Sequence, residues 1–357
     1  MSLRIAYWNN LPSPYFIDRL NALNRIEDVE VFGIFSDGDR ADRKWEGQQT
    51  RAEFEFAILS EQDAAPVPAL IDIAKSQKPD LVIGLYSDRT YMEGILRLKA
   101  MGIPYVIRFM PSFEAWFPKS RSREAAKHLL FRSVLGAVVT SNDAVETAMS
   151  YGFKADQLCV APQSISLDFF TPGEHTNSAA HPPRIGYVGR YLKKKGLGDL
   201  FAACEHLSAT GFEGELHLAG FGDDFDIPSA AAACSLNVVD HGHLEGNYLV
   251  DFYRSLTALA FPTLGDQHGL VATEALACGV PVVSTSSAGG IEARVLNGYN
   301  GRVVSPSSPG ELALALAATM DEIDQIKPNC RPSVLTLTHE RWASTVEGHC
   351  RTLLGKE

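Results

Sequence analysis

Short runs of apolar residues alternate with longer amphipathic stretches through the first 165 residues of the chain. Runs of consecutive apolar positions are typical of strands that are covered on both faces of a sheet. The predicted strands are Arg4–Trp8, Val29–Phe35, Leu81–Leu85, Tyr105–Arg108, Ala137–Thr140 and Leu158–Ala161. Helical patterns lie between several of them, at Tyr15–Asn24, Met92–Met101, Ser122–Val134 and Asp143–Tyr151. The alternation therefore predicts a parallel sheet with helices on both faces.

The same alternation restarts after Thr171–Pro183, whose proline, serine and asparagine residues are typical of a connector between domains. The predicted strands beyond it are Arg184–Val188, Glu215–Ala219, Thr257–Phe261, Val280–Ser284 and Gly301–Val304. The predicted helices are Gly196–Leu207, Gly269–Cys278, Pro309–Met320 and Glu340–Leu354. Each half of the chain thus resembles a Rossmann-like α/β unit, whose ligands bind at the carboxyl ends of the strands.

The chain is long enough for two domains, because a single hydrophobic core rarely grows beyond about 250–300 residues. We place the first domain at residues 1–165 and the second at residues 166–339 of the 357 residues. The helix at about 340–357 is expected to pack back on the first domain. Two such units that face each other would leave a cleft between them, where small-molecule sites concentrate.

Composition and charge narrow the functions open to such a chain. The sequence is 45% hydrophobic and 21% charged, and its net charge is −11. Because nucleic acids and anionic membranes attract positive surfaces, we expect no nucleic-acid partner and at most peripheral membrane contact. The six cysteines lack zinc or redox spacing, and the start, MSLRIAYWNN, has no basic segment that leads into an apolar run. No run of about 18 apolar residues is present either, so a soluble, cytoplasmic protein is expected.

A glycine and two basic residues follow the first predicted strand of the second half, in RIGYVGRYLKKKG (184–196). Gly189 permits close backbone approach at the strand end. Arg190 and Lys195 supply cations that suit a diphosphate. The alternative is a solvated basic face, with Lys193–Lys195 pointing to water. On this segment alone the two interpretations have about equal weight.

A polar loop and a helix start form the second motif, in PTLGDQHGLVATEALACGVP (262–281). Gly269 is expected to open the helix, and the backbone N–H groups of residues 269–271 would be unpaired and able to hold a phosphate. Asp266 precedes the helix, and Glu274 lies roughly 7–8 Å along its axis, so one ligand could meet both acids. In the alternative interpretation, Asp266 caps the helix and Glu274 is a surface residue. Against this, the apolar neighbours of Glu274 indicate burial with a partner.

Together these segments resemble the donor site of glycosyltransferase family 4, which has the GT-B fold. The family pattern is a strand, a Gly-Arg pair, a Lys-Gly pair, and later a carboxylate seven residues before a glutamate. This chain supplies Gly189-Arg190, Lys195-Gly196, and Asp266 with Glu274. The resemblance continues through LAGFG (218–222), VVDHGH (238–243), EALACGVP (274–281) and Gly289-Gly290, and it covers most of residues 155–325. It implies two Rossmann-like domains with parallel sheets that face an interdomain cleft.

The resemblance also implies roles for single residues. Arg190 and Lys195 would bind the donor diphosphate, Glu274 would hold the ribose hydroxyls, and Asp266 would contact the transferred sugar; we expect these four to be catalytic. The other expected donor-binding residues are Gly189, Gly242, His243, Leu244, Gln267, His268, Gly269, Leu270 and Val271, with 242–244 near the base. No Asp-x-Asp occurs in these segments, so no metal and no other cofactor is expected. The cations and helix amides would supply the positive field instead.

This sequence departs from the family pattern at three places. Asp266 stands where glutamate is usual and is one methylene shorter, so the sugar or its contact is expected to differ. Gln163 and Ser164 stand where the family often has Asn-Gly. The residues after Gly290 are Ile-Glu-Ala, where Ile-Pro-Glu is common.

The first half offers fewer signals. Asn9 and Asn10 follow the first strand, where the family often has a glycine-rich loop, so they are candidates to face the cleft; ordinary turn residues are an equal alternative. Many family members have a histidine after the strand that ends here at Arg108, but this chain has no histidine at that place. Arg108 and Ser112 are therefore the candidate cleft residues for the acceptor. The alternative for Arg108 is a structural ion pair.

The resemblance predicts a retaining glycosyltransferase that moves a hexose-type sugar from a nucleotide diphosphate sugar, with UDP as the expected nucleotide, to an acceptor hydroxyl. The acceptor would be a sugar, a lipid-linked glycan or a small molecule, in glycan, polysaccharide or glycoconjugate biosynthesis. Two alternatives remain, a GT-B-like sugar-nucleotide epimerase and a non-catalytic nucleotide-sugar-binding protein. The sequence does not determine the base, the sugar, the acceptor, the oligomeric state or a general base.

Overall fold

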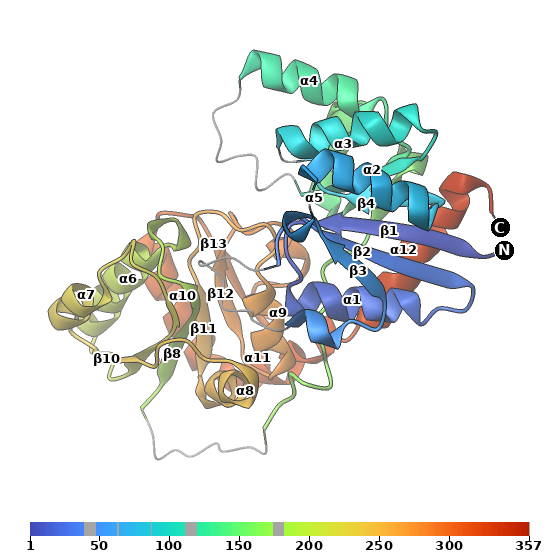
Figure 1. Ribbon diagram of the computed structural model, residues 1–357. Helices are drawn as coiled ribbons and strands as arrows, with labels where there is room; N and C mark the ends of the chain where they lie inside the picture. The colour runs from blue at the N-terminus through green and yellow to red at the C-terminus, as the bar shows by residue number, and fades with distance from the viewer. Residues whose placement is uncertain (39–47, 63, 87, 111–119, 174–181, 357) are drawn as a thin grey trace. The chain divides into compact units, whose positions relative to one another are not determined.

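Figure 1 shows a computed structural model of the chain, which describes residues 1–38, 48–62, 64–86, 88–110, 120–173 and 182–356. These residues form two compact units. The N-terminal unit contains the described residues of 1–110, 120–164 and 338–356, and the C-terminal unit contains those of 165–337. The last stretch of the chain thus belongs to the first unit.

A parallel sheet of seven strands forms the centre of the N-terminal unit as described, in the order β3-β2-β1-β4-β5-β6-β7. The strands are β1 (Leu3–Asn9), β2 (Val29–Phe35), β3 (Glu55–Ile58), β4 (Leu81–Gly84), β5 (Tyr105–Phe109), β6 (Gly136–Val139) and β7 (Leu158–Val160). The helices are α1 (Pro14–Asn24), α2 (Pro66–Gln77), α3 (Arg89–Ala100), α4 (Arg121–Phe131), α5 (Asn142–Ser150) and α12 (His339–Leu354). The strand order reverses between β1 and β4, which is the switch point where such sheets bind ligands.

Different helices cover the two faces of this sheet (Figure 1). Successive side chains of a strand point to opposite faces. Trp8 of β1 therefore packs with Ile95 of α3 in one core. Its neighbour Tyr7 packs with Phe16 of α1 and Trp342 of α12 in the other. The face under α1 and α12 thus carries Tyr7.

The C-terminal unit repeats this topology with six described parallel strands in the order β10-β9-β8-β11-β12-β13. The strands are β8 (Arg184–Arg190), β9 (Glu215–Phe221), β10 (Asn237–Asp240), β11 (Ala258–Phe261), β12 (Val282–Thr285) and β13 (Gly301–Val304). The helices are α6 (Leu197–Ala209), α7 (Ile227–Ala233), α8 (Gly246–Ser255), α9 (Leu270–Ala277), α10 (Pro309–Asp321) and α11 (Ile323–Cys330). Here the order reverses between β8 and β11.

The predicted α/β fold with parallel sheets is confirmed. Every strand predicted from an apolar run forms, with ends that agree within two residues. The sequence analysis missed β3 and β10, which are edge strands with exposed residues such as Glu55, Asn237 and Asp240, so neither contains a long apolar run. Most of the predicted connector, Thr171–Pro183, lies outside the described residues.

Candidate functional site

Two loops meet at the carboxyl ends of β8 and β11 in the C-terminal unit. After β8 the chain forms a short 3-10 helix, η5 (Lys193–Lys195), and Gly196 leads into α6 with a φ of 72°. A Cβ atom on Gly196 would lie 1.9 Å from the carbonyl oxygen of Pro262, so only glycine allows this approach. The backbone N–H of Leu264 also donates to the carbonyl oxygen of Lys194 at 3.0 Å. These contacts hold the loop after β8 against the loop after β11.

The contact between the loops brings Lys195 to Asp266. Nζ of Lys195 donates to Oδ2 of Asp266, from a position 71 residues earlier in the chain. The two side chains are 18% and 21% exposed, so water screens the pair only in part. Lys193 and Lys194 are exposed. The alternative in which all three lysines point to water is therefore wrong for Lys195.

Asp266 also closes the turn that leads into α9. Its Oδ1 accepts hydrogen bonds from the backbone N–H groups of His268 at 3.0 Å and Gly269 at 2.7 Å. Burial alone would raise the pKa of Asp266, but the charge of Lys195 and these hydrogen bonds lower it below its ordinary value. The prediction of an unpaired Gly269 N–H is wrong, because Asp266 accepts its hydrogen bond. Asp266 accepts from His268 and Gly269, which precede α9, and from no N–H group of the helix itself, so the alternative in which it caps the helix is not supported.

Two backbone N–H groups remain open at the start of α9. Gly269 precedes the helix with a φ of 69°, and a Cβ atom there would lie 2.4 Å from the ring of Phe261. Among the residues that the structure describes, the N–H groups of Leu270 and Val271 have no hydrogen-bond acceptor. Such groups at a helix start bind anions. The start of α9 can therefore hold one oxyanion in the loop that contains Asp266.

Glu274 lies on the second turn of α9 and is only 2% exposed. Its Oε2 accepts a hydrogen bond from the hydroxyl of Tyr253 in α8 at 2.7 Å. Tyr253 is fully buried as well. The expectation that Glu274 has a buried partner is confirmed, and the alternative of a surface residue is wrong. The sequence analysis did not select Tyr253, because nothing in the sequence links it to Glu274.

Arg190 ends β8 at the same carboxyl edge and is half-buried. Gly189 before it has a φ of 148°, a conformation that favours glycine. The hydroxyl of Tyr187 donates to the carbonyl oxygen of Arg190 at 2.8 Å. Burial raises the pKa of Tyr187, and the negative charge of Asp266 raises it further. The hydroxyl of Tyr187 thus bonds to the backbone of Arg190 and lies close enough to Asp266 for the negative charge of Asp266 to affect its pKa.

Gly242, His243 and Leu244 form the loop after β10. The N–H of Gly242 donates to Oδ1 of Asp240 at 2.9 Å. The ring of His243 meets the ring of Phe221, the last residue of β9, with centroids 5.0 Å apart. This loop therefore lies along the same carboxyl edge as Arg190, beyond β9 and away from the contact between Lys195 and Asp266.

A buried arginine that the sequence analysis missed holds the loop before α9. Arg294 is 5% exposed. Its guanidinium donates to the carbonyl oxygens of His268, Gly269 at 3.2 Å and Gly289 at 3.1 Å. His268 is buried and Gln267 beside it is half-buried. The available signal was a cation in an apolar run shortly after the Gly-Gly pair.

In the N-terminal unit the structure brings Asn9 and Arg108 together. Nη1 of Arg108 donates to Oδ1 of Asn9 at 3.2 Å, and Nη2 contacts the sulfur of Met110 at 3.6 Å. Within the described residues Arg108 has no ion pair, so the alternative of a structural ion pair is not supported. Asn10 instead accepts a hydrogen bond from the hydroxyl of Tyr91 at 2.7 Å. Ser112 lies outside the described residues.

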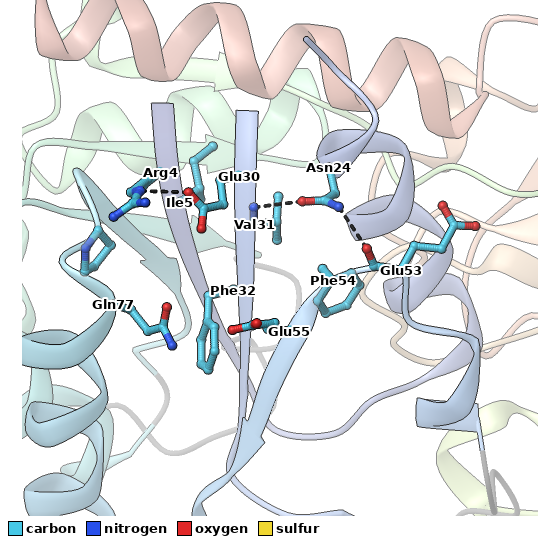
Figure 2. Close-up of a pocket in the computed structure, with 11 residues that line it drawn as sticks. Arg4, Ile5, Asn24, Glu30, Val31, Phe32, Glu53, Phe54, Glu55 and Gln77 are labelled. Atoms are coloured by element: carbon cyan, nitrogen blue, oxygen red, sulfur yellow. Dashed lines mark hydrogen bonds and ion pairs between the residues drawn. The ribbon is translucent and has the colours of Figure 1, made fainter. Parts of the chain in front are cut away.

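A pocket of about 220 Å³ lies elsewhere in this unit (Figure 2). It is lined by early residues of β1, β2 and β3, such as Arg4, Glu30 and Glu55. Figure 2 shows the ion pair between Arg4 and Glu30, at 2.7 Å. This is the amino edge of the sheet, opposite the edge where such sheets bind ligands. None of the predicted site residues that the structure describes lines it.

Comparison with known proteins gives the relationship in sequence. Residues 182–322 match the family model described as "Glycosyl transferases group 1". The D-inositol 3-phosphate glycosyltransferase of Xylanimonas cellulosilytica is 31% identical over 202 residues, which cover 51% of this chain and 47% of the relative. The chain spans about half the length of the curated relatives it matches.

Solved structures show the same fold over the whole chain. Sucrose-phosphate synthase from Thermosynechococcus elongatus has a TM-score of 0.80 at 19% identity, over 99% of this chain and 100% of that chain. Anabaena Alr3699/HepE in complex with UDP-glucose has a TM-score of 0.76 at 16% identity, over 99% and 100% of the two chains. Residues 182–322 are thus similar in sequence to the group 1 glycosyl transferases, and the whole chain shares the fold of these solved structures. The recognition made from the sequence is thereby confirmed.

The matched residues 182–322 lie within the C-terminal unit, which also contains the contact between Lys195 and Asp266. No helix built from the described residues is both long and apolar enough to cross a membrane. In the same part of the chain, no group of three or more histidine, cysteine, aspartate or glutamate side chains is arranged to hold a metal ion.

Proposed function

We propose that the protein is a retaining glycosyltransferase that transfers a hexose-type sugar from a nucleotide diphosphate sugar to an acceptor hydroxyl. The observation that carries the proposal is the pairing of Lys195 with Asp266 beside the start of α9. It combines a cation, an acid and the open N–H groups of Leu270 and Val271. A sugar diphosphate matches this set, because its phosphates suit the cation and the helix start and its hydroxyls suit the acid.

The proposed reaction breaks the bond between the anomeric carbon and the diphosphate oxygen, and it forms a bond from that carbon to the acceptor oxygen. Negative charge develops on the leaving diphosphate while the sugar gains oxocarbenium character. Arg190, Lys195 and the N–H groups of α9 would stabilise this charge, which is often the largest single contribution to catalysis. The leaving phosphate takes the proton of the acceptor hydroxyl, so a protein base is not required. No metal ion forms part of the proposal.

Lys195 changes its partner in this scheme. In the unliganded protein it donates to Asp266. When the donor binds, its ammonium group would turn to the diphosphate, and Asp266 would then accept a hydrogen bond from the sugar. Glu274 would hold the ribose, and the hydrogen bond from Tyr253 supports this role because it fixes the carboxylate on α9. The loop 242–244 would lie near the base.

Three finer parts of the proposal have separate support. UDP is the proposed nucleotide, and the related fold of Anabaena Alr3699/HepE in complex with UDP-glucose supports it. The N-terminal domain, residues 1–165, is proposed to bind the acceptor for glycan, polysaccharide or glycoconjugate synthesis. The cytoplasm is the proposed setting, which the six free thiols of the chain support.

The deciding experiment incubates the purified chain with UDP-glucose, and in parallel with GDP-, ADP- and dTDP-glucose, without added metal and with a chelator. Sugar acceptors, including an inositol phosphate, are offered as a panel. We expect release of the nucleoside diphosphate together with a glycosylated product that keeps the anomeric configuration, as read by mass spectrometry and NMR. Arg190→Ala should lower this transfer by about 10²–10³-fold.

Each competing result has its own signature. An epimerised nucleotide sugar that forms without acceptor would identify an epimerase. Binding of the nucleotide sugar without transfer or hydrolysis across the panel would indicate a binding protein. Lys194→Met is the matched control, because Lys194 is exposed in the same loop and should leave the rate near that of the wild type. An unchanged rate for Arg190→Ala would exclude this residue from the mechanism.

A further inference from the structure

A second group of cations lies in the N-terminal unit, and its centre is Arg19. This residue is in the middle of α1, where its guanidinium lies 5.8 Å from the ring centroid of Phe16 and 5.6 Å from that of Trp342. Arg19 is only 4% exposed, and its Nε is buried without a hydrogen-bond partner. No carboxylate pairs with it among the residues that the structure describes. A buried guanidinium that lacks an acid and has an unsatisfied N–H is costly, because neither its charge nor that donor is compensated.

The nearest acid to Arg19 in the chain is already engaged. Asp18 forms an ion pair with Arg51 at 2.7 Å. Burial and, to a smaller extent, the positive charge of Arg108 together lower the pKa of Arg19 to about 9, although Tyr7 and Asp18 oppose this shift. The two guanidinium groups thus repel each other, and Asp18, the acid whose charge opposes this effect, is paired with Arg51. Groups whose pKa values are shifted by burial and by nearby charges cluster at functional sites.

Arg108 connects this group to the ligand-binding edge of the sheet. It lies near the carboxyl end of β5 and is half-buried, so it offers an approach from outside. Its guanidinium lies 5.3 Å from the centroid of the Phe16 ring, the same ring that Arg19 contacts. Its hydrogen-bond partners, Asn9 and Met110, carry no charge. Both arginines therefore gather around one aromatic ring, and neither pairs with an acid in the described parts of the chain.

Two further buried polar atoms around Arg19 have no hydrogen-bond partner, the hydroxyl of Tyr7 and Nε2 of His339. Tyr7 is fully buried on β1. Burial raises the pKa of Tyr7, while the charges of Arg108 and Arg19 oppose this rise, which places its hydroxyl near both arginines. His339 is also within the field of Arg19. Buried polar groups are nearly always paired, so several orphans together are unusual.

We infer that Arg19, Arg108 and the hydroxyl of Tyr7 form a binding subsite for an oxyanion, a phosphate monoester or a carboxylate, in the N-terminal unit. All three groups donate hydrogen bonds, two carry positive charge, and the subsite extends toward the carboxyl ends of β1 and β5. The assignment of this subsite to an acidic group on the acceptor rests on the proposed glycosyl transfer. The binding of an anion at the subsite does not depend on that function.

The binding experiment titrates inorganic phosphate, and separately acetate, against the wild-type chain and follows the melting temperature. We expect phosphate or acetate to raise the melting temperature of the wild type, because a ligand that binds only the folded state stabilises it. Arg19→Met and Arg108→Met should weaken the apparent affinity by about 10-fold or more, which is the usual effect of losing a charged hydrogen bond. Arg25→Met is the matched control, because Arg25 is 59% exposed at the end of the same helix.

The stability of the anion-free variants separates a ligand site from a structural arginine. If Arg19 is an unpaired cation that awaits a ligand, Arg19→Met should melt at the same temperature as the wild type or higher. Arg19→Lys keeps the charge and should retain part of the phosphate effect. A lower melting temperature for Arg19→Met, with an undiminished phosphate shift, would make Arg19 a purely structural residue and overturn the inference. Any stabilisation by phosphate bound at the C-terminal unit is the same in the wild type and in both Arg19 variants, because all three proteins have the same C-terminal unit. It therefore does not affect the comparison.

Transfer assays connect the subsite to the acceptor. With a saturating donor, each neutral sugar acceptor is compared with its phosphorylated or carboxylated counterpart. We expect a preference for one charged class and a rise in its KM in Arg108→Met, with a smaller change for neutral sugars. Equal use of charged and neutral acceptors, with the anion titration still positive, would assign the subsite to free anions. If no transfer occurs at all, the titration alone decides whether the subsite exists, so the two proposals fail separately.

Discussion

The ammonium group of Lys195 and the carboxylate of Asp266 pair at the start of α9, although 71 positions separate them in the sequence. The contact depends on the close approach of Gly196 to the carbonyl oxygen of Pro262. Because Oδ1 of Asp266 simultaneously accepts from His268 and Gly269, its two oxygens have separate tasks. One oxygen shapes the loop, and the other holds the cation that the proposed reaction uses.

This division of tasks predicts the behaviour of two variants and their combination. Lys195→Met should lower kcat/KM by about 10²–10³-fold, because a charge-stabilising donor is lost. Asp266→Asn keeps an oxygen that can accept from His268 and Gly269, so it should preserve the loop. In the double variant the melting temperature should recover relative to Lys195→Met, because no partly buried carboxylate is left without its cation.

The rate of the double variant decides what Lys195 does. If Lys195 acts on the donor, the double variant should have a kcat/KM well below that of Asp266→Asn alone. Equal values for the double variant and Asp266→Asn would mean that Lys195 acts only by neutralising Asp266. Steady-state kinetics and thermal melts on the same four proteins provide this comparison.

Tyr253→Phe should destabilise the C-terminal unit and weaken donor binding. The change removes a 2.7 Å hydrogen bond to the buried carboxylate of Glu274, at an expected cost of about 1–3 kcal/mol in the free energy of unfolding. The KM for the donor should rise more than kcat falls, because Glu274 is proposed to hold the ribose and not the reacting atoms. Denaturant melts and initial rates measure both effects.

Tyr248→Phe is the matched control for this change. Tyr248 lies on the same helix, α8, but its side chain is 78% exposed. Its loss should alter the free energy of unfolding by less than about 0.5 kcal/mol. Equal effects at the two tyrosines would show that the hydrogen bond to Glu274 contributes nothing.

The buried parts of the fold were predictable from the sequence because a strand covered on both faces must be apolar at every position. The strand predicted at Leu81–Leu85, which forms at Leu81–Gly84 with every residue buried, is an example. Strand β10 was missed because it lies at a sheet edge, where Asn237 and Asp240 are exposed. Tertiary position, and not local pattern, decides that such a segment becomes a strand.

The candidate site was predictable only as far as local motifs extend. Residues such as Asp266 and Glu274 lie within one loop and its helix, so their spacing identified them. The partners that explain their chemistry, Lys195 for one and Tyr253 for the other, come from other elements. Arg19 gave no signal, because an arginine within an amphipathic helix is ordinarily exposed.

Cys234 should be the most reactive of the six cysteines. It is half-buried at the end of α7, where a hydrogen bond from Cys204 lowers the pKa of its thiol and the backbone N–H of Leu236 adds to this effect against the opposing influence of burial. Burial raises the pKa of Cys159 to about 11 and that of Cys278 to about 12. The thiolate is the reactive form, so iodoacetamide near neutral pH should modify Cys234 first.

Peptide mass mapping over a time course of alkylation checks this order. Cys204→Ala should slow the modification of Cys234, because the hydrogen bond that stabilises its thiolate is removed. Cys330→Ala serves as the control, since Cys330 is buried far along the chain in α11 and should not alter the rate. Modification of all six thiols at one common rate would contradict the predicted difference.

His339 should make the fold sensitive to acid. Burial and, to a smaller extent, the positive charge of Arg19 lower the pKa of His339 to about 4. Below its ordinary pKa of about 6.5 the unfolded chain takes up a proton that the folded chain refuses until pH falls to about 4. Stability is therefore fully present above about pH 6.5 and declines as the pH falls through this window, by about 3 kcal/mol in total.

Urea melts at several pH values should show a shallower decline for His339→Gln, whereas His206→Gln, at an exposed histidine, should follow the wild type. Parallel pH profiles for all three proteins would mean that His339 is not the group that titrates.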